Sequence, residues 1–258
     1  MHQTDPPRPP KEVLPTMYDL KSEDPEEPGL PDQFHIWQPR LLDETFCPPT
    51  YPADQVFTAT DLNLYYDLHH PLWYKRPDWF AVLGRSRLYE QQDLRLSYVV
   101  WQEGIDPFIA VELLSPGTEK EDLGQRLREV NQPPTKWEVY EQILRVPYYV
   151  VFDRYTDHLQ AFALMPSRYQ PLSLANNRLW LEEIQIGLGL WQGIYQGVER
   201  LWLRWYDATG NWIPTTAERE AQNLSLLEQE RQKAEQERQR AERLAAKLKE
   251  LGIDPEQL

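Results

Sequence analysis

The chain of 258 residues is long enough for one sizeable domain with appendages, or for two small domains, and its 41% of hydrophobic residues can build a substantial core. A single cysteine, Cys47, excludes an internal disulfide and a cysteine-based zinc site, and it favours a reducing, cytoplasmic compartment. No apolar run reaches the roughly 18 residues of a membrane helix. The first residues also lack the apolar segment of a secretory signal.

The chain is acidic as a whole, with a net charge of −14. Residues 1–48 account for −6 and residues 216–258 for −2, so that residues 49–215 carry the remaining −6. Tight non-specific binding of nucleic acid relies on a basic surface. The charge balance therefore argues against such binding, although it leaves room for a local basic groove.

Residues 1–48 are rich in proline and acidic side chains, as in "DPPRPPKEVLP" and "KSEDPEEPGLPDQ". This composition favours an extended arm with little regular structure. The apolar stretch "FHIWQPRLLDETF", residues 34–46, interrupts the arm. We expect that stretch to dock on the core.

Residues 49–215 alternate between patterns typical of strands and of helices, which predicts an α/β domain. The expected strands are "NLYYDL" (63–68), "DWFAVLG" (78–84), "LSYVVWQEG" (96–104), "FIAVELL" (108–114), "VPYYVVFDR" (146–154) and "HLQAFALM" (158–165). The last two should pair as a hairpin across "YTD", and "RWYDATGNWIPT" (204–215) should form another hairpin. "PTKWEVYEQIL" (134–144) has helical spacing, and the glycines of "GLGLWQG" (187–193) are interpreted as turn residues.

Residues 216–251 are filled with strong helix formers and contain no proline and no glycine, which predicts one long helix. Leu227, Ala234, Ala241 and Leu248 lie seven residues apart on one stripe. The companion positions are apolar at both ends and charged in the middle. The pattern is equally compatible with a weak homodimeric coiled coil and with a solvated helical tail.

Two acidic residues stand at comparable places in the expected sheet. Asp78 opens a strand and Glu112 lies late in another, 34 residues on, with an expected hairpin strand between them. Two carboxylates and a strand-end carbonyl form a hard-oxygen site that suits Mg²⁺ or Mn²⁺. From the spacing alone, a strand-start aspartate and a solvated strand-end glutamate remain open as interpretations.

The residues of three sequence motifs favour the metal site. "RPDWFAVLG", "VELLSPGTEKEDLG" and "KWEVYEQILRVPYYVVFD" resemble the Uma-type putative restriction endonuclease family. The matching positions are Pro77–Asp78, Glu112 with Ser115, Pro116 and Thr118, Asp122, Lys136 with Tyr140, and Tyr148–Asp153. The resemblance implies the PD-(D/E)XK nuclease fold, a mixed sheet flanked by helices, and Mg²⁺-dependent cleavage of phosphodiester bonds.

The resemblance also implies roles for particular residues. Asp78 and Glu112 would ligate the metal, and the backbone carbonyl of Leu113 would complete its inner shell. The usual lysine, two residues after the second acid, is here Leu114. Lys136 on the following helix is the first candidate for that basic role, Arg126 the second and Lys120, within a run of charges, the third.

Two functional hypotheses follow. The first is a metal-dependent endonuclease that acts on nucleic acid, with DNA favoured over RNA. The second is a non-catalytic interaction or regulatory protein that keeps the nuclease fold and recruits partners through its arm and helical tail. The acidic core and the displaced lysine favour the second hypothesis, whereas the intact Asp78 and Glu112 favour the first.

Overall fold

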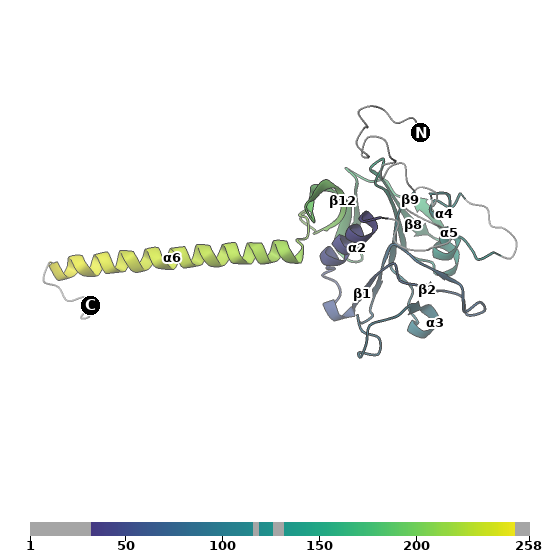
Figure 1. Cartoon of the computed structure of the whole chain (residues 1–258), viewed down its shortest axis with the longest axis horizontal. Coiled ribbons are helices and arrows are strands. Elements are labelled where there is room, and N and C mark those ends of the chain that lie inside the picture. The colour runs from purple at the N-terminus through teal and green to yellow at the C-terminus, as the bar shows by residue number, and fades with distance from the viewer. Residues whose placement is uncertain (1–31, 116–118, 126–131, 251–258) are drawn as a thin grey trace, which may run out of the picture. The chain divides into compact units, whose positions relative to one another are not determined.

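The computed structural model describes residues 32–115, 119–125 and 132–250 (Figure 1). The chain divides into two compact units, one ending at Ile213 and the other beginning at Pro214. The first unit contains all the strands of the described residues, and the second contains the long helix α6 (Thr216–Glu250). Within the described residues, none of the helices combines the length and the apolar character needed to cross a membrane.

A six-stranded mixed sheet forms the centre of the first unit, which confirms the expected α/β class. Its strand order is β1-β4-β6-β7-β8-β9. Only β6 and β7 run parallel, and the other neighbours are antiparallel. The strands are β1 (Val56–Thr60), β4 (Trp79–Leu83), β6 (Ile109–Leu113), β7 (Tyr148–Asp153), β8 (His158–Met165) and β9 (Arg168–Pro171).

Two smaller sheets complete the unit. One is the antiparallel sheet of β10 (Arg178–Leu181), β11 (Ile186–Tyr195) and β12 (Val198–Tyr206). The other has the order β3-β2-β5 and consists of β3 (Tyr74–Lys75), β2 (Leu64–Tyr65) and β5 (Tyr98–Val99). The short helical elements are η1 (Ala53–Gln55), α3 (Val100–Glu103), α4 (Glu119–Asp122), α5 (Lys136–Glu138) and the π-helix η2 (Val139–Ile143).

Three expectations from the sequence need correction. Within the stretch 96–104, only Tyr98–Val99 form a strand, β5, and α3 begins at Val100. That strand is also not part of a hairpin, because β5 pairs in parallel with β2 in a separate sheet. The glycines of residues 187–193 lie inside the long strand β11 and not in a turn.

Tyr206 on β12 explains why β11 needs a glycine at position 187. Gly187 pairs with Tyr206, and a Cβ atom at Gly187 would lie 2.1 Å from the tyrosine Cζ atom. The ring therefore covers the space that any other side chain would occupy. The Tyr206 hydroxyl donates to the carbonyl of Leu179 at 3.0 Å and so anchors the ring across the sheet.

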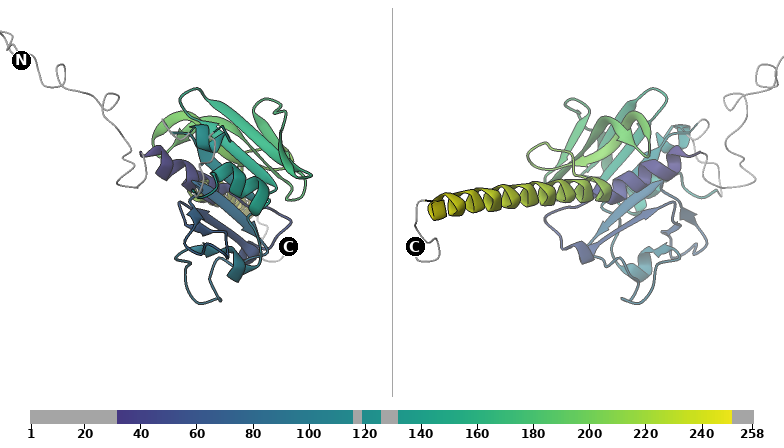
Figure 2. Two further views of the ribbon diagram at one scale, coloured as in Figure 1. Left: turned by 90° about the vertical axis from the view of Figure 1, so that its right-hand side faces the viewer. Right: turned by 60° about the vertical axis from the view of Figure 1, so that its left-hand side comes forward.

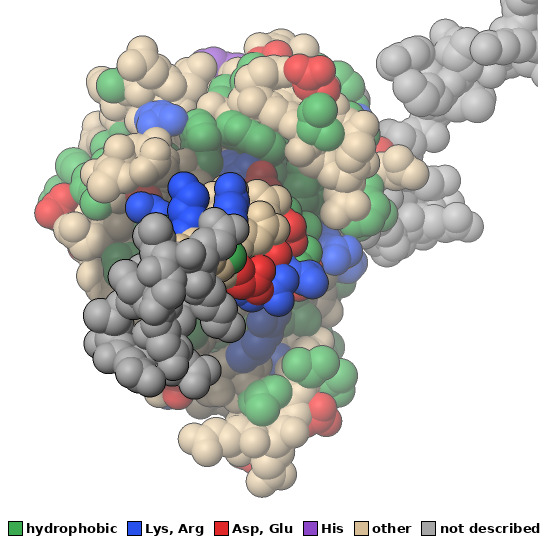
Figure 3. All heavy atoms as spheres, turned by 90° about the vertical axis from the view of Figure 1, so that its left-hand side faces the viewer, with side chains coloured by type: hydrophobic (Ala, Val, Ile, Leu, Met, Phe, Trp, Pro, Cys, Tyr) green, Lys and Arg blue, Asp and Glu red, His purple; other side chains and the backbone are tan. Residues whose placement is uncertain are grey.

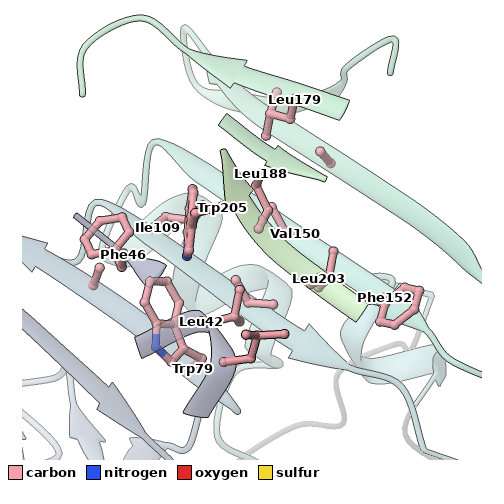
Figure 4. Packing of buried hydrophobic residues seen from close by; sticks show 14 of the residues in the cluster. Leu42, Phe46, Trp79, Ile109, Val150, Phe152, Leu179, Leu188, Leu203 and Trp205 are labelled. Atoms are coloured by element: carbon pink, nitrogen blue, oxygen red, sulfur yellow. The ribbon is translucent and has the colours of Figure 1, made fainter. Parts of the chain in front are cut away.

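The hydrophobic core is split between the two faces of the central sheet. Trp79, Val111 and Leu113 belong to one cluster, together with Val150 and Phe152. Figure 4 shows this cluster, in which Trp79, Leu42 and Trp205 lie close together. The residues between them in sequence, such as Phe80 and Ala110, belong to the cluster on the other face, because side chains alternate along a strand.

Helix α2 (Phe34–Thr45) docks on the first face of the sheet, as expected for residues 34–46. Its Leu41 and Leu42 have no exposed surface. Gln38 makes two buried hydrogen bonds to the backbone of Leu203 on β12, one from its Nε2 atom and one to its Oε1 atom, both 2.8 Å long. Both views of Figure 2 place α2 alongside β12. The docked helix thereby fixes the position of the residues at its N-terminus.

Helix α6 matches the long helix expected for residues 216–251, and Thr215 caps its start. The Thr215 backbone N–H donates to Glu218 at 2.7 Å, and the Glu218 backbone N–H donates to the threonine hydroxyl at 3.2 Å. Leu227 on the expected stripe is 63% exposed, and Leu224, the first of its companion positions, is 67% exposed. In the space-filling view of one face, Lys and Arg side chains lie next to Asp and Glu side chains (Figure 3).

The close contact between Gly187 and Tyr206 leads to a stability prediction. We expect Gly187→Ala to lower the free energy of unfolding by about 1–3 kcal/mol, because the added methyl group displaces the Tyr206 ring. In a Tyr206→Ala background the same substitution should have little further effect. Urea denaturation of the four proteins measures both changes, and equal effects in the two backgrounds would contradict the steric explanation.

Candidate active site

The pairing of β4 with β6 brings the two predicted acids together. Trp79 pairs with Val111 in the antiparallel register, and the same register places Asp78 opposite Glu112. Both side chains lie on the face that carries Phe80 and Ala110. Asp78 and Glu112 therefore share one face of the sheet at the point where β4 begins.

The Asp78 side chain accepts the backbone hydrogen bond of Leu113 that a neighbouring strand would otherwise accept. Strand β4 begins at Trp79, so no strand partner faces the backbone of Leu113 on that side. The Leu113 N–H instead donates to Asp78 Oδ2 at 2.6 Å. This bond fixes the Asp78 carboxylate beside the end of β6.

Lys136 reaches the acids from the start of the helix that follows. Thr135 and Glu138 form a capping box, which places Lys136 in the first turn of α5. The Lys136 Nζ atom lies 2.8 Å from Glu112 Oε2 and 3.2 Å from Asp122 Oδ1. The lysine thus bridges two carboxylates from two different elements, β6 and α4.

Tyr140 holds the other oxygen of Glu112. Its hydroxyl donates to Glu112 Oε1 at 2.9 Å, and the tyrosine lies in the π-helix η2. A π-helical turn shifts side chains relative to an α-helix, and such turns often occur at functional sites. Each oxygen of the fully buried Glu112 side chain therefore has one hydrogen-bond donor.

Asp122 is a third carboxylate of the site, and its residue is only 1% exposed. Its backbone carbonyl accepts a hydrogen bond from the Tyr149 hydroxyl at 2.9 Å. A Cβ atom at Gly124 would lie 2.8 Å from the Trp137 ring, so the segment after Asp122 packs closely against α5. These contacts hold the Asp122 side chain next to Lys136.

His35 on α2 approaches the same site from the other face. Its Nε2 atom lies 3.0 Å from the Leu113 carbonyl oxygen, and its Nδ1 atom lies 3.1 Å from Asp32 Oδ1. The other carboxylate oxygen of Asp32 forms an ion pair with Arg154. The His35 residue is 2% exposed. Both nitrogens face oxygens that only accept hydrogen bonds, so the geometry requires a doubly protonated imidazolium ring.

The buried carboxylates of the site repel one another. Burial raises the pKa of Glu112 well above its usual value, with Asp122 and Asp78 adding to the effect and Lys136 opposing it. Burial likewise raises the pKa of Asp78, and Lys136 and His35 oppose the change. A cation in addition to Lys136 would relieve this repulsion.

The two cationic side chains respond in the opposite way. Burial by itself would lower the pKa of Lys136, but Glu112, Asp122 and Asp78 together raise it well above its usual value. Burial would also lower the pKa of His35, and the carboxylates of Asp32 and Asp78 with the Leu113 carbonyl raise it. The surrounding oxygens therefore favour the charged form of both side chains, and the carboxylates of Asp32, Asp78, Glu112 and Asp122 outnumber these two cations.

The donor set fits a divalent cation that prefers oxygen ligands. Asp78 and Glu112 supply carboxylate oxygens, and Leu113 supplies a carbonyl oxygen that no strand pairs on that side. Mg²⁺ and Mn²⁺ take such ligands. In the described part of the chain, no group of three or more His, Cys, Asp and Glu side chains is arranged to hold a metal. A metal bound here would need the backbone oxygen and water molecules to complete its ligands.

The structure thus brings together Asp78, Glu112, Leu113 and Lys136, four of the residues singled out from the sequence. Arg126 lies outside the described residues. Asp122 and Tyr140 stood in the sequence pattern without a role, and only the structure shows their contacts with Lys136 and Glu112. Apart from the expected docking of residues 34–46, no pattern in the sequence pointed to His35.

The comparisons with known proteins identify the family of the chain. A family model named Uma2, described as "Putative restriction endonuclease", matches residues 15–193. The match includes every residue of the site described above, and the chain belongs to this family. No curated protein matches the chain.

One similar solved structure is described as a putative nuclease belonging to DUF820 from Anabaena variabilis ATCC 29413. The two chains share 11% sequence identity, with a TM-score of 0.33. The alignment covers 52% of this chain and 63% of that one, so it spans less than two thirds of the length of that nuclease.

The double contact of Lys136 leads to a prediction about stability in the absence of metal. Lys136→Ala leaves Glu112 and Asp122 buried without their cation, which should cost about 3–5 kcal/mol. Urea denaturation with EDTA at pH 7.5 measures the loss.

Lys75 provides a matched control for that measurement. Its Nζ atom lies 3.1 Å from Glu121 Oε1, and both side chains are partly exposed. Lys75→Ala should therefore cost about 1 kcal/mol or less. If both substitutions lower the free energy of unfolding equally, the buried contacts of Lys136 stabilise the protein no more than a partly exposed ion pair does.

Proposed function

We propose that this protein is a divalent-metal-dependent endonuclease that hydrolyses phosphodiester bonds of nucleic acid. The observation that carries the proposal is the convergence of Asp78, Glu112, the Leu113 carbonyl and Lys136 at the ends of β4 and β6. Membership of a family described as restriction endonucleases supports it and favours DNA over RNA as the substrate.

The chain's own residues would divide the work of the reaction. Asp78 and Glu112 would hold Mg²⁺ or Mn²⁺, together with the Leu113 carbonyl. The bound ion would supply a water molecule of lowered pKa and polarise the scissile phosphate. Tyr140 would keep Glu112 in place through its oxygen Oε1.

Lys136 would stabilise the negative charge that develops on the phosphate in the transition state. Its Nζ atom already lies against Glu112, the proposed metal ligand, and 20% of its side chain is exposed. A substrate phosphate at the ion could therefore reach the ammonium group. This arrangement corresponds to the PD-(D/E)XK pattern, with the lysine supplied by α5 and not by the end of β6.

A second function, a nuclease-fold protein that recruits partners without cutting nucleic acid, is favoured by one observation. Both oxygens of Glu112, the Asp78 Oδ2 atom and the Leu113 carbonyl already have partners within the protein. A metal would have to displace or share some of these contacts. The assay below separates the two functions.

Replacement of either proposed ligand tests the endonuclease. We expect cleavage of a panel of DNA and RNA substrates at low salt with Mn²⁺, and none with EDTA. Asp78→Asn and Glu112→Gln should abolish cleavage and weaken Mn²⁺ binding, whereas Lys136→Ala should abolish cleavage and retain Mn²⁺ binding.

The pH and the controls make that test decisive. Because the pKa values of Asp78 and Glu112 are raised, protons compete with the ion, and Mn²⁺ affinity should fall as the pH falls. Equal cleavage by wild type and Glu112→Gln would identify a contaminant. Mn²⁺ binding without cleavage of any substrate would favour the recruiting protein.

We also propose that α6 pairs with a second copy of the chain through its apolar stripe. Leu227 on this stripe and Leu224 at a companion position are largely exposed in one chain. Leu224→Glu and Leu227→Glu should each shift the full chain to the monomer in sedimentation velocity runs. Leu226→Glu changes a residue that is 58% exposed but lies off the stripe, and it should leave the dimer intact. A monomeric wild type would rule out the pairing.

A further inference from the structure

The peptide unit of Leu113 is held by side chains on both of its polar atoms. Its N–H donates to Asp78 at 2.6 Å, and its carbonyl oxygen accepts from His35 Nε2 at 3.0 Å. Leu113 is 2% exposed, and buried backbone groups need partners. Because β4 begins at Trp79, Asp78 and His35 supply the two contacts that a neighbouring strand would otherwise provide.

The His35 ring is itself held in a fixed orientation. Asp32 Oδ1 accepts from Nδ1 and also from the backbone N–H groups of Phe34 and His35, at 2.8 and 3.2 Å. Phe34 contacts the ring edge-on, with the centroids 6.0 Å apart. These contacts come from Asp32, just before α2, and from Phe34 at the start of α2, which is docked on β12. The ring therefore aims Nε2–H at one point, the Leu113 carbonyl oxygen.

We propose that His35 is a positioning residue of the metal site, which fixes the direction of the Leu113 carbonyl through its Nε2–H group. The inference rests on the proposed function, because that carbonyl is the proposed third ligand of the ion. A carbonyl oxygen has two lone pairs, so it can accept from His35 and bind a cation at the same time. Partners of this kind orient metal ligands and affect affinity without touching the metal.

A purely structural role for His35 makes a different prediction. A histidine that only satisfies a buried carbonyl would affect folding stability and leave metal affinity unchanged. The charge of the ring adds a further effect, since any neutral replacement removes a cation near the ion. A test must therefore compare variants of equal charge that differ in the donor alone.

Three neutral replacements make that comparison. The Nε2 atom of glutamine lies at the same number of bonds from Cβ as the His35 Nε2 atom, so His35→Gln keeps a donor to Leu113. His35→Met has a similar length and no donor. His35→Asn keeps a donor at the position of Nδ1, towards Asp32, and has none towards Leu113.

The measurement is Mn²⁺ affinity of the full-length protein by titration calorimetry, without nucleic acid, at a temperature where circular dichroism shows each variant folded. We expect His35→Gln to bind Mn²⁺ about tenfold more tightly than His35→Met and His35→Asn. Either of the two variants without a donor towards Leu113 suffices if the other does not fold. Equal affinities for the glutamine variant and a donor-free variant would overturn the inference, even if their stabilities differ.

The chain offers a matched control. His70 and Asp67 form a second histidine–aspartate pair three residues apart, with 2.7 Å between Nδ1 and Oδ2, but the His70 side chain is 51% exposed. His70→Met should not change Mn²⁺ affinity. If wild type itself binds no Mn²⁺, the proposed function fails together with the inference. If wild type binds but the His35 variants do not differ, the inference alone fails.

Discussion

A carboxylate with no exposed surface, that of Glu112, is the constraint on which the rest of the site depends. A buried charge needs compensation by hydrogen bonds and opposite charge. Lys136 and Tyr140 provide it, one donor to each oxygen. Both come from the segment after Pro134, whose capping box and π-helical turn place one residue at the start of the helix and the other in the following turn.

The same constraint explains the irregular features around the site. Strand β4 begins at Trp79, so the end of β6 has no strand partner on that side and its backbone is available to side chains. Asp78 and His35 take up the N–H and the carbonyl of Leu113. An unpaired strand end is where a protein can present a carbonyl to a metal, and the surrounding contacts keep that carbonyl from being buried without a partner.

The N-terminal segment is a part of the site as well as of the core. Helix α2 packs Leu41 and Leu42 into the sheet and brings His35 to Leu113. A contact across 78 residues of sequence leaves no local pattern. "FHIW" shows apolar residues that need a core, and it does not show which backbone group the histidine meets. The docking of residues 34–46 was therefore predictable, and the role of His35 was not.

Local patterns were sufficient where the physics is local. The strand that Asp78 precedes, the strand that carries Glu112 and the helix α6 follow from alternation, helix formers and capping residues. Local sequence patterns gave wrong predictions where side chains from distant segments decide the conformation. The glycines at 187–193 suggested a turn, but Gly187 is needed because the Tyr206 ring lies across it.

The sequence by itself determined the α/β class and the long helix, and its resemblance to a known family singled out Asp78 and Glu112, with Lys136 as the first of three candidates for the basic residue. The tertiary structure alone decided that β4 pairs directly with β6, so that Asp78 and Glu112 share a face. It alone added Asp122 and His35 to the site. Helix and strand formation depends on neighbours a few positions apart, whereas strand pairing and the compensation of a buried charge depend on which distant segments pack together.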